Sequence, residues 1–150
     1  MKKLIESVAK FHHQIGAHVA ETPRILETDI ENDGETANVL RSALEKISND
    51  TSQPSELRIR LCLALEELCE WVEAHVEGDL VAAADAWGDR CYVLFGDSVS
   101  AGLPVEAIFS EVHRSNMTKT EPTGANGKGS KGDAFERTSL EQILNPQVND

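Results

Sequence analysis

The sequence predicts an all-α protein built as an antiparallel bundle of helices, with a loop rich in glycine and lysine toward its C-terminal end. Apolar residues recur at intervals of three and four along most of the chain, which is typical of amphipathic helices. The loops between the longest of these segments are short, which favours antiparallel packing of successive helices. No segment shows the alternation of apolar and polar residues that predicts a strand, and the length of 150 residues predicts a single domain, residues 1–150.

Two helices are expected in the N-terminal third of the chain. The first covers residues 4–20 and should end before Pro23, because proline cannot continue a helix. Residues 27–35 are polar and strongly acidic, and the sequence Asn-Asp-Gly at 32–34 predicts a turn. A second helix is expected over residues 35–47, followed by a polar loop.

The strongest helical pattern covers residues 55–76. Ser55 can cap the start of this helix, and Gly78 lies where helices commonly end. A fourth helix is expected over residues 79–101, and Gly102 should close it.

A fifth helix is expected from Pro104 to about Met117. After it, residues 118–133 contain glycine, lysine and almost no apolar residue, which predicts a loop or mobile segment, although a disordered tail has the same composition. Apolar residues then return, and Thr138 and Glu141 have the spacing of a capping box. We therefore expect the last segment to dock back on the body of the protein.

The charge balance limits the possible partners. Asp and Glu number 26 against 14 Lys and Arg, which gives a net charge of −12. Because this charge repels phosphates, it argues against binding to a nucleic acid polymer or to an anionic membrane surface. No apolar run could span a membrane and no secretory signal is evident. Three cysteines without the spacing of a zinc site are typical of a reducing compartment, so we expect a cytoplasmic location.

A group of acidic residues is the clearest candidate for chemistry. Glu66 and Glu67 precede Glu70 by four and three residues, so the three carboxylates can converge on one face of a helix. Asp85 and Asp89 are four residues apart on the following helix and also share a face. From residue 61 to residue 86 the chain has no lysine or arginine that could relieve the repulsion between these acids. Clustered carboxylates suit a hard divalent cation, whereas the alternative interpretation is a solvated acidic face.

A second group of polar residues follows the fifth helix or lies at its end. It consists of Arg114, Asn116, Lys119, Lys128 and Lys131. In an acidic chain, these side chains could clamp a polyphosphate. The alternative is that the bases complement the dipole of the helix and make the loop soluble.

Together these residues resemble the all-α nucleotide pyrophosphohydrolases, the superfamily that includes MazG, the dimeric dUTPases and phosphoribosyl-ATP pyrophosphohydrolase. The resemblance rests on the acidic segment 66–70, the acidic pair on the next helix, the segment 89–96, the segment 112–119, and the pairs Gly-Lys at 127–128 and Lys-Gly at 131–132. The later segments look like the phosphoribosyl-ATP pyrophosphohydrolase branch. The similarity covers about residues 55–140.

The resemblance implies hydrolysis of a nucleoside triphosphate between its α and β phosphates, with release of a monophosphate and pyrophosphate. It implies that Mg²⁺, with Mn²⁺ as a possible substitute, is held by Glu66, Glu67, Glu70, Asp85 and Asp89. Where many members carry a further acid, three residues before the last ligand, this chain has Ala86, so Asp85 is the available substitute. Either Glu66 or Glu67 would act as the base that orients the attacking water.

The resemblance also bears on the substrate and on partners. It implies that the second polar group holds the phosphates, that the loop of residues 118–133 closes as a lid, and that the chain forms a homodimer or a dimer of dimers. The polar segment 27–54 would shape the pocket for the base. Phosphoribosyl-ATP and dUTP remain open as specific substrates, and an acidic helical module that binds a protein partner without catalysis remains the alternative of another class.

Overall fold

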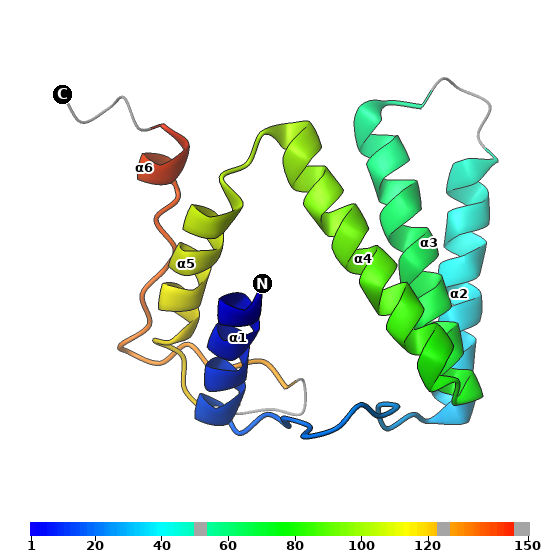
Figure 1. Cartoon of the computed structure of the whole chain (residues 1–150), viewed down its shortest axis with the longest axis horizontal. Helices are drawn as coiled ribbons and strands as arrows, with labels where there is room; N and C mark the ends of the chain where they lie inside the picture. The colour runs from blue at the N-terminus through cyan, green and yellow to red at the C-terminus, as the bar shows by residue number, and fades with distance from the viewer. Residues whose placement is uncertain (50–53, 123–126, 146–150) are drawn as a thin grey trace. The chain divides into compact units, whose positions relative to one another are not determined.

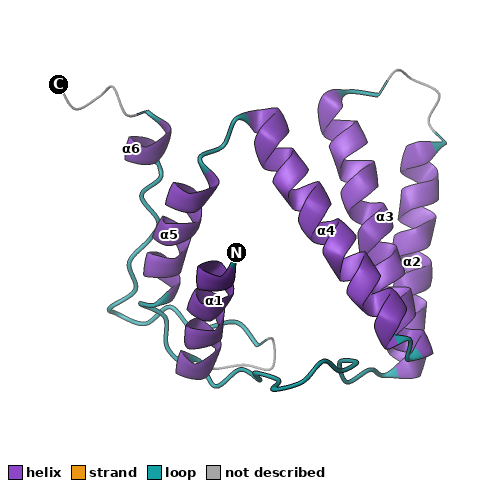
Figure 2. Ribbon diagram, viewed as in Figure 1, coloured by secondary structure: helices purple, strands orange, loops and turns teal. Residues whose placement is uncertain are grey.

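The structure, a computed structural model, describes residues 1–49, 54–122 and 127–145 (Figures 1 and 2). In these ranges the regular elements are all α-helices, and Thr120 and Ser130 form an isolated antiparallel bridge. The predicted all-α fold is therefore confirmed. No single helix among the described residues has the length and apolar content needed to cross a membrane. The helices α4 (Leu80–Ala101) and α5 (Val105–Asn116) meet these two criteria only together, as a bent pair.

The chain divides into two compact units. One unit, here called the three-helix unit, is Thr22–Ala101, and the other, here called the terminal unit, joins Met1–Glu21 to Gly102–Asp150. The prediction of a single domain stays a prediction.

The three-helix unit contains α2 (Ile30–Ser48), α3 (Glu56–Glu77) and α4 (Leu80–Ala101). Successive helices run in opposite directions, and α3 packs against both α2 and α4 (Figure 1). The residues buried in this unit have small side chains. They are Ala37, Cys69, Ala74, His75, Ala83 and Ala86, of which only the histidine is large. Small side chains let helices approach closely, so the side chains that flank them on α3 and α4 are brought near one another.

Both ends of α3 and the start of α4 form as predicted, for local reasons. The Ser55 hydroxyl accepts a hydrogen bond from the Arg58 N–H at 3.2 Å and caps α3. Gly78 ends α3 with a φ of +74°, a left-handed conformation that glycine adopts without strain. One carboxylate oxygen of Asp79 then accepts from two N–H groups in the first turn of α4, each at 3.0 Å.

The start of α2 differs from the prediction. The helix begins at Ile30, so it includes residues 32–34, and the turn predicted there is wrong. Asp29 Oδ1 accepts from the Asn32 N–H at 3.2 Å, while Asp33 Oδ2 accepts from the Asp29 N–H at 2.8 Å. This reciprocal capping stabilises the start of the helix, and the stabilisation outweighs the tendency of the Asn-Asp-Gly sequence to form a turn. The polar loop after α2 includes residues 50–53, which lie outside the described residues.

The terminal unit contains α1 (Lys2–Gln14), α5 (Val105–Asn116) and the short α6 (Glu141–Leu144). Helix α1 packs against α5. The predicted range of α5 is confirmed, but α1 ends at Gln14 and not near residue 20. The reason is Gly16, whose φ of +67° is the left-handed conformation that ends many helices.

The segment after the loop docks on α5, as expected. The Ser115 hydroxyl donates to the Glu136 carbonyl at 2.7 Å, and the Glu136 N–H donates to Thr118 Oγ1 at 2.9 Å. The Ser139 N–H donates to Glu111 Oε1 at 2.7 Å. These hydrogen bonds join the segment to α5 and to the residues that follow it.

The predicted capping box at Thr138 and Glu141 is wrong. Leu140 occupies the N-cap position of α6 and makes no side-chain hydrogen bond there. The backbone just before α6 is held instead by a tertiary hydrogen bond, which the Ser139 N–H donates to Glu111. Part of the predicted loop, residues 123–126, lies outside the described residues.

Candidate functional site

The five predicted metal ligands come from two packed helices of the three-helix unit. Glu66, Glu67 and Glu70 lie within little more than one turn of α3, and Asp85 and Asp89 lie one turn apart on α4. The two helices pack against each other, and Figure 1 shows α4 inclined to α3 and nearest to it at the end where the two are joined. The fold thus explains how residues from 66 to 89 form one group, here called the carboxylate cluster.

Glu67 lies at the centre of the carboxylate cluster. Its Oε2 atom is buried and has no hydrogen-bond partner in the described part of the chain. Burial raises the pKa of Glu67, and the negative charges of Glu70, Asp89, Glu66 and Asp85 raise it further. All four other predicted ligands are therefore close enough to Glu67 to act on it electrostatically.

The remaining carboxylates of the cluster face solvent. Glu66, Glu70, Asp85 and Asp89 are exposed. Over residues 1–49, 54–122 and 127–145, no three His, Cys, Asp or Glu side chains are already arranged to hold a metal ion. To hold an ion, the exposed carboxylates of the cluster would have to turn toward the Oε2 atom of Glu67. The donor set consists of oxygen atoms alone, and it fits Mg²⁺ or Mn²⁺ better than zinc.

Ala86 and Asp85, two neighbours on α4, differ in burial. Ala86 is only 3% exposed, whereas Asp85 beside it is exposed. A carboxylate at position 86 would have to fit into this close-packed part of the bundle. The negative charge of Asp85 contributes to the raised pKa of Glu67.

Sequence reasoning missed a cation beside the carboxylate cluster. Arg41 on α2 binds both carboxylate oxygens of Glu73 on α3, with 2.9 Å between Nε and Oε1. The hydrogen bond to Glu73 raises the pKa of Arg41, and the negative charge of Glu70 adds to the rise. One signal in the sequence could have pointed to this pair. Glu73 follows Glu70 by three residues, so it adds a further acid to the same face of the helix, where a cation from a neighbouring helix would balance its charge.

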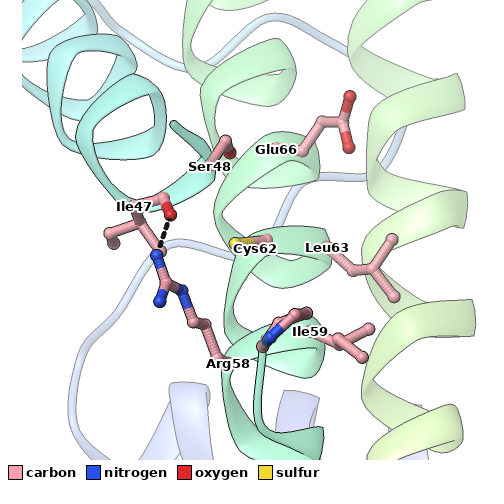
Figure 3. Close-up of a pocket in the computed structure, with 8 residues that line it drawn as sticks. Ile47, Ser48, Arg58, Ile59, Cys62, Leu63 and Glu66 are labelled. Atoms are coloured by element: carbon pink, nitrogen blue, oxygen red, sulfur yellow. Dashed lines mark hydrogen bonds between the residues drawn. The ribbon is translucent and has the colours of Figure 1, made fainter. Parts of the chain in front are cut away.

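A cavity of about 340 Å³ opens beside Glu66 (Figure 3). It is lined by Ile47, Ser48, Pro54, Arg58, Ile59, Cys62, Leu63 and Glu66, from the end of α2, the residues before α3 and the first half of α3. Figure 3 shows the lining side chains of α3 in a row that runs from Ile59 through Cys62 to Glu66, and Arg58 donating to the Ile47 carbonyl. The cavity is mainly apolar and has a carboxylate at one end.

The predicted phosphate-binding residues belong to the terminal unit. Arg114 on α5 donates to both carboxylate oxygens of Glu111, at 2.8 and 2.9 Å, and also to Glu136. These hydrogen bonds lower the pKa of Glu111 to about 2, with the Ser139 N–H contributing as well. The guanidinium of Arg114 is thus engaged by two carboxylates.

The other members of this group lie at the end of α5 and after it. Lys119 Nζ donates to Asn116 Oδ1 at 2.8 Å, so the structure brings these two predicted residues together. Lys131 Nζ lies 5.0 Å from the ring centre of Phe135, a cation–π contact. Lys128 is exposed.

A comparison with known families finds a match. The family model described as phosphoribosyl-ATP pyrophosphohydrolase matches residues 40–116, just over half of the 150 residues. The match contains Arg41, Arg114, Asn116 and the whole carboxylate cluster, and it ends before Lys119. No match was found among curated proteins or among solved structures. The chain therefore belongs to the phosphoribosyl-ATP pyrophosphohydrolase family, within the MazG-like all-α superfamily of nucleotide pyrophosphohydrolases, and is a hydrolase that acts on acid anhydrides.

Proposed function

We propose that the chain is a metal-dependent nucleoside triphosphate pyrophosphohydrolase that cleaves a (d)NTP between the α and β phosphates. The products are a (d)NMP and pyrophosphate. The observation that carries the proposal is the buried Oε2 of Glu67, which lacks a hydrogen-bond partner among the described residues and is surrounded by four other carboxylates. Such an arrangement is costly unless a cation compensates it.

The residues of the carboxylate cluster fit Mg²⁺, with Mn²⁺ as a substitute. The ligands would be Glu66, Glu67, Glu70, Asp85 and Asp89. When bound, the cation supplies positive charge that neutralises the triphosphate and makes the α phosphorus more open to attack. A chain of net charge −12 could not otherwise hold a polyphosphate beside its own carboxylates.

The protein's own residues would handle the proton of the attacking water. Water adds its oxygen to the α phosphorus, the bond to the bridging oxygen of the β phosphate breaks, and pyrophosphate leaves. Glu66 or Glu67 would accept the proton that the water releases. Glu66 belongs both to the carboxylate cluster and to the lining of the cavity, so it lies between the site of chemistry and the proposed site of the nucleoside.

The cavity beside Glu66 is suited to the nucleoside. Its volume of about 340 Å³ falls within the range of small-molecule pockets, and its lining is mainly apolar with polar groups at its ends. Residues 47, 48 and 54 line it, in agreement with the proposal that the segment 27–54 shapes the base pocket. Because the matching family model is that of phosphoribosyl-ATP pyrophosphohydrolase, phosphoribosyl-ATP is the second candidate substrate, ahead of dUTP.

For the phosphates we propose the polar residues of the terminal unit. Lys119 is the clearest of them, because Asn116 holds its ammonium group in place. Lys128 and Lys131 are exposed and follow in the same segment. Arg114 would bind a phosphate only after its hydrogen bonds to Glu111 and Glu136 break.

We further propose that the chain forms a homodimer or a dimer of dimers. Large apolar side chains are highly exposed on α3 and α4, among them Leu57 at 78%, Tyr92 at 82% and Val99 at 82%. Burial of these side chains against a second copy would remove apolar surface from water. Sedimentation equilibrium of the purified chain tests this, and a monomer at all concentrations would contradict it.

Pyrophosphate release tests the reaction directly. The assay uses a panel of canonical and altered dNTPs and NTPs together with phosphoribosyl-ATP, in Mg²⁺, in Mn²⁺ and in chelator. We expect release that requires the metal and is strongest for one substrate. No release across the panel from folded protein would contradict the proposal, and the absence of saturable Mg²⁺ or Mn²⁺ binding in calorimetry would favour the non-catalytic interaction module.

A variant tests the assignment of the site. Glu70→Gln should lower kcat by at least about 100-fold, because it removes a charged ligand without changing the size of the side chain. Its far-UV circular dichroism should match that of the wild type, because Glu70 is exposed. Glu45→Gln, an exposed position on α2 outside the cluster, is the matched control and should keep full activity. Retained activity in Glu70→Gln would contradict the site.

A further inference from the structure

We infer that Arg41 is a positioning residue that neutralises Glu73 and thereby sets the affinity of the carboxylate cluster for a divalent cation. The inference rests on the proposed metal-dependent function and deepens it, because it names a residue outside the predicted ligands that controls the site.

The geometry of the pair supports this role. The planar guanidinium of Arg41 binds both oxygens of the Glu73 carboxylate, the bidentate arrangement that gives the strongest pairing of these groups. The two side chains are only 38% and 34% exposed, and the pair joins α2 to α3. Both oxygens of Glu73 are therefore engaged by a neighbouring helix.

The position of Glu73 explains why the cluster needs this pairing. Glu73 follows Glu70 by three residues, so the two side chains are neighbours on α3. Without a countercharge, Glu73 would be a sixth negative carboxylate beside five others. Glu70 lies close enough to Arg41 to raise the pKa of the guanidinium, so the charge on Arg41 also acts on the cluster itself.

The inference predicts the sign of each charge change. Arg41→Gln removes one positive charge beside the cluster and leaves Glu73 uncompensated, so a divalent cation should bind more tightly. Glu73→Gln leaves Arg41 uncompensated, so the cation should bind more weakly. A unit charge about 8 Å from a divalent ion changes its binding by roughly five-fold in a water-like dielectric. The double variant Arg41→Gln/Glu73→Gln restores the charge balance and should return the affinity to that of the wild type.

A purely structural role predicts the opposite sign for the first variant. If the pair served only to hold α2 against α3, its loss would loosen the bundle and weaken metal binding in Arg41→Gln, in Glu73→Gln and in the double variant alike. Arg41→Lys is the conservative variant, because it keeps the charge and loses the bidentate fork. It should keep an affinity close to that of the wild type.

The experiment is a titration of the nucleotide-free chain with Mn²⁺, followed by calorimetry and by the electron paramagnetic resonance signal of free Mn²⁺. The matched control is Arg60→Gln, which breaks a second ion pair between helices of the same unit, Arg60 Nε to Asp97 Oδ1 at 2.6 Å. Neither of its members belongs to the carboxylate cluster. This control should leave the Mn²⁺ affinity unchanged.

The outcomes separate the inference from the proposed function. Tighter binding in Arg41→Gln, weaker binding in Glu73→Gln and recovery in the double variant and in Arg41→Lys would establish it. Suppose that the wild type binds Mn²⁺ saturably. Weaker or unchanged binding in Arg41→Gln would then overturn the inference, as would a failure of the double variant or of Arg41→Lys to recover the wild-type affinity. Either result would leave the proposed metal site intact. The absence of saturable binding by the wild type would overturn both.

Discussion

Replacement of Glu67 by Gln should make the metal-free protein more stable while it removes metal binding. The Oε2 atom of Glu67 is buried without a partner among the described residues, and four acids act on its charge. The folded chain therefore holds a negative charge in a place that disfavours it. The variant keeps the shape of the side chain and removes that charge.

The structure sets the size of the effect. A buried polar group without a partner costs about 1–3 kcal/mol, and a charged one costs more. Gln still places one polar atom in the same position, so we expect only part of this cost to be recovered, about 1 kcal/mol. For a chain of this size, a gain of this amount raises Tm by about 2–4 °C.

The sign of the pH dependence follows from the raised pKa of Glu67. Between the ordinary glutamate pKa of 4.5 and the raised value, the folded state binds more protons than the unfolded state. The wild type therefore loses stability as pH rises through this window. The advantage of Glu67→Gln should be absent below the ordinary pKa and complete once pH exceeds the raised value.

Unfolding in urea with chelator, monitored by tryptophan fluorescence at pH 4 and pH 7.5, checks the prediction. Trp71 and Trp87 are the two tryptophans of the chain, and both belong to the three-helix unit, so the signal reports on the unit that contains Glu67. Saturating Mn²⁺ should stabilise the wild type more than the variant, because only the wild type keeps the ligand. Glu45→Gln should show no such changes. A variant less stable than the wild type at pH 7.5 in chelator would refute the reasoning.

Two further predictions concern other parts of the structure. A methyl group at Gly96 would lie 2.5 Å from the guanidinium Nη2 of Arg60, so Gly96→Ala should not yield the gain of about 1 kcal/mol that alanine brings to a helix. In an Arg60→Ala background the same change should stabilise by about that amount, and equal effects in both backgrounds, measured by urea unfolding, would contradict the contact. The carboxyl of Glu111 should titrate at about pH 2 by NMR, and Arg114→Gln should raise its pKa toward 4.5. Stability due to this lowered pKa is complete above pH 4.5 and is lost as pH falls toward 2, and a wild-type midpoint above pH 4 would rule the pairing out.

The sequence correctly predicted the helix ends that depend on capping residues close by in the chain. Ser55 and Gly78 bound α3 as predicted, because each acts through hydrogen bonds or dihedral angles within a few residues. The predictions failed where another interaction, local or tertiary, competed with the pattern. At residues 32–34 the turn sequence lost to the capping by Asp29 and Asp33, and at Thr138 the capping pattern lost to a hydrogen bond from Ser139 to a helix far away in the chain.

The sequence by itself determined the helical fold class and the composition of the carboxylate cluster, because helical periodicity places Glu66, Glu67 and Glu70 on one face without reference to the rest of the chain. Only the tertiary structure decided which oxygen is buried, which acids lie close enough to act on it, and that Arg41 pairs with Glu73. Burial and pairing depend on how closely separate helices approach, and that distance is set by small side chains packed between residues far apart in sequence.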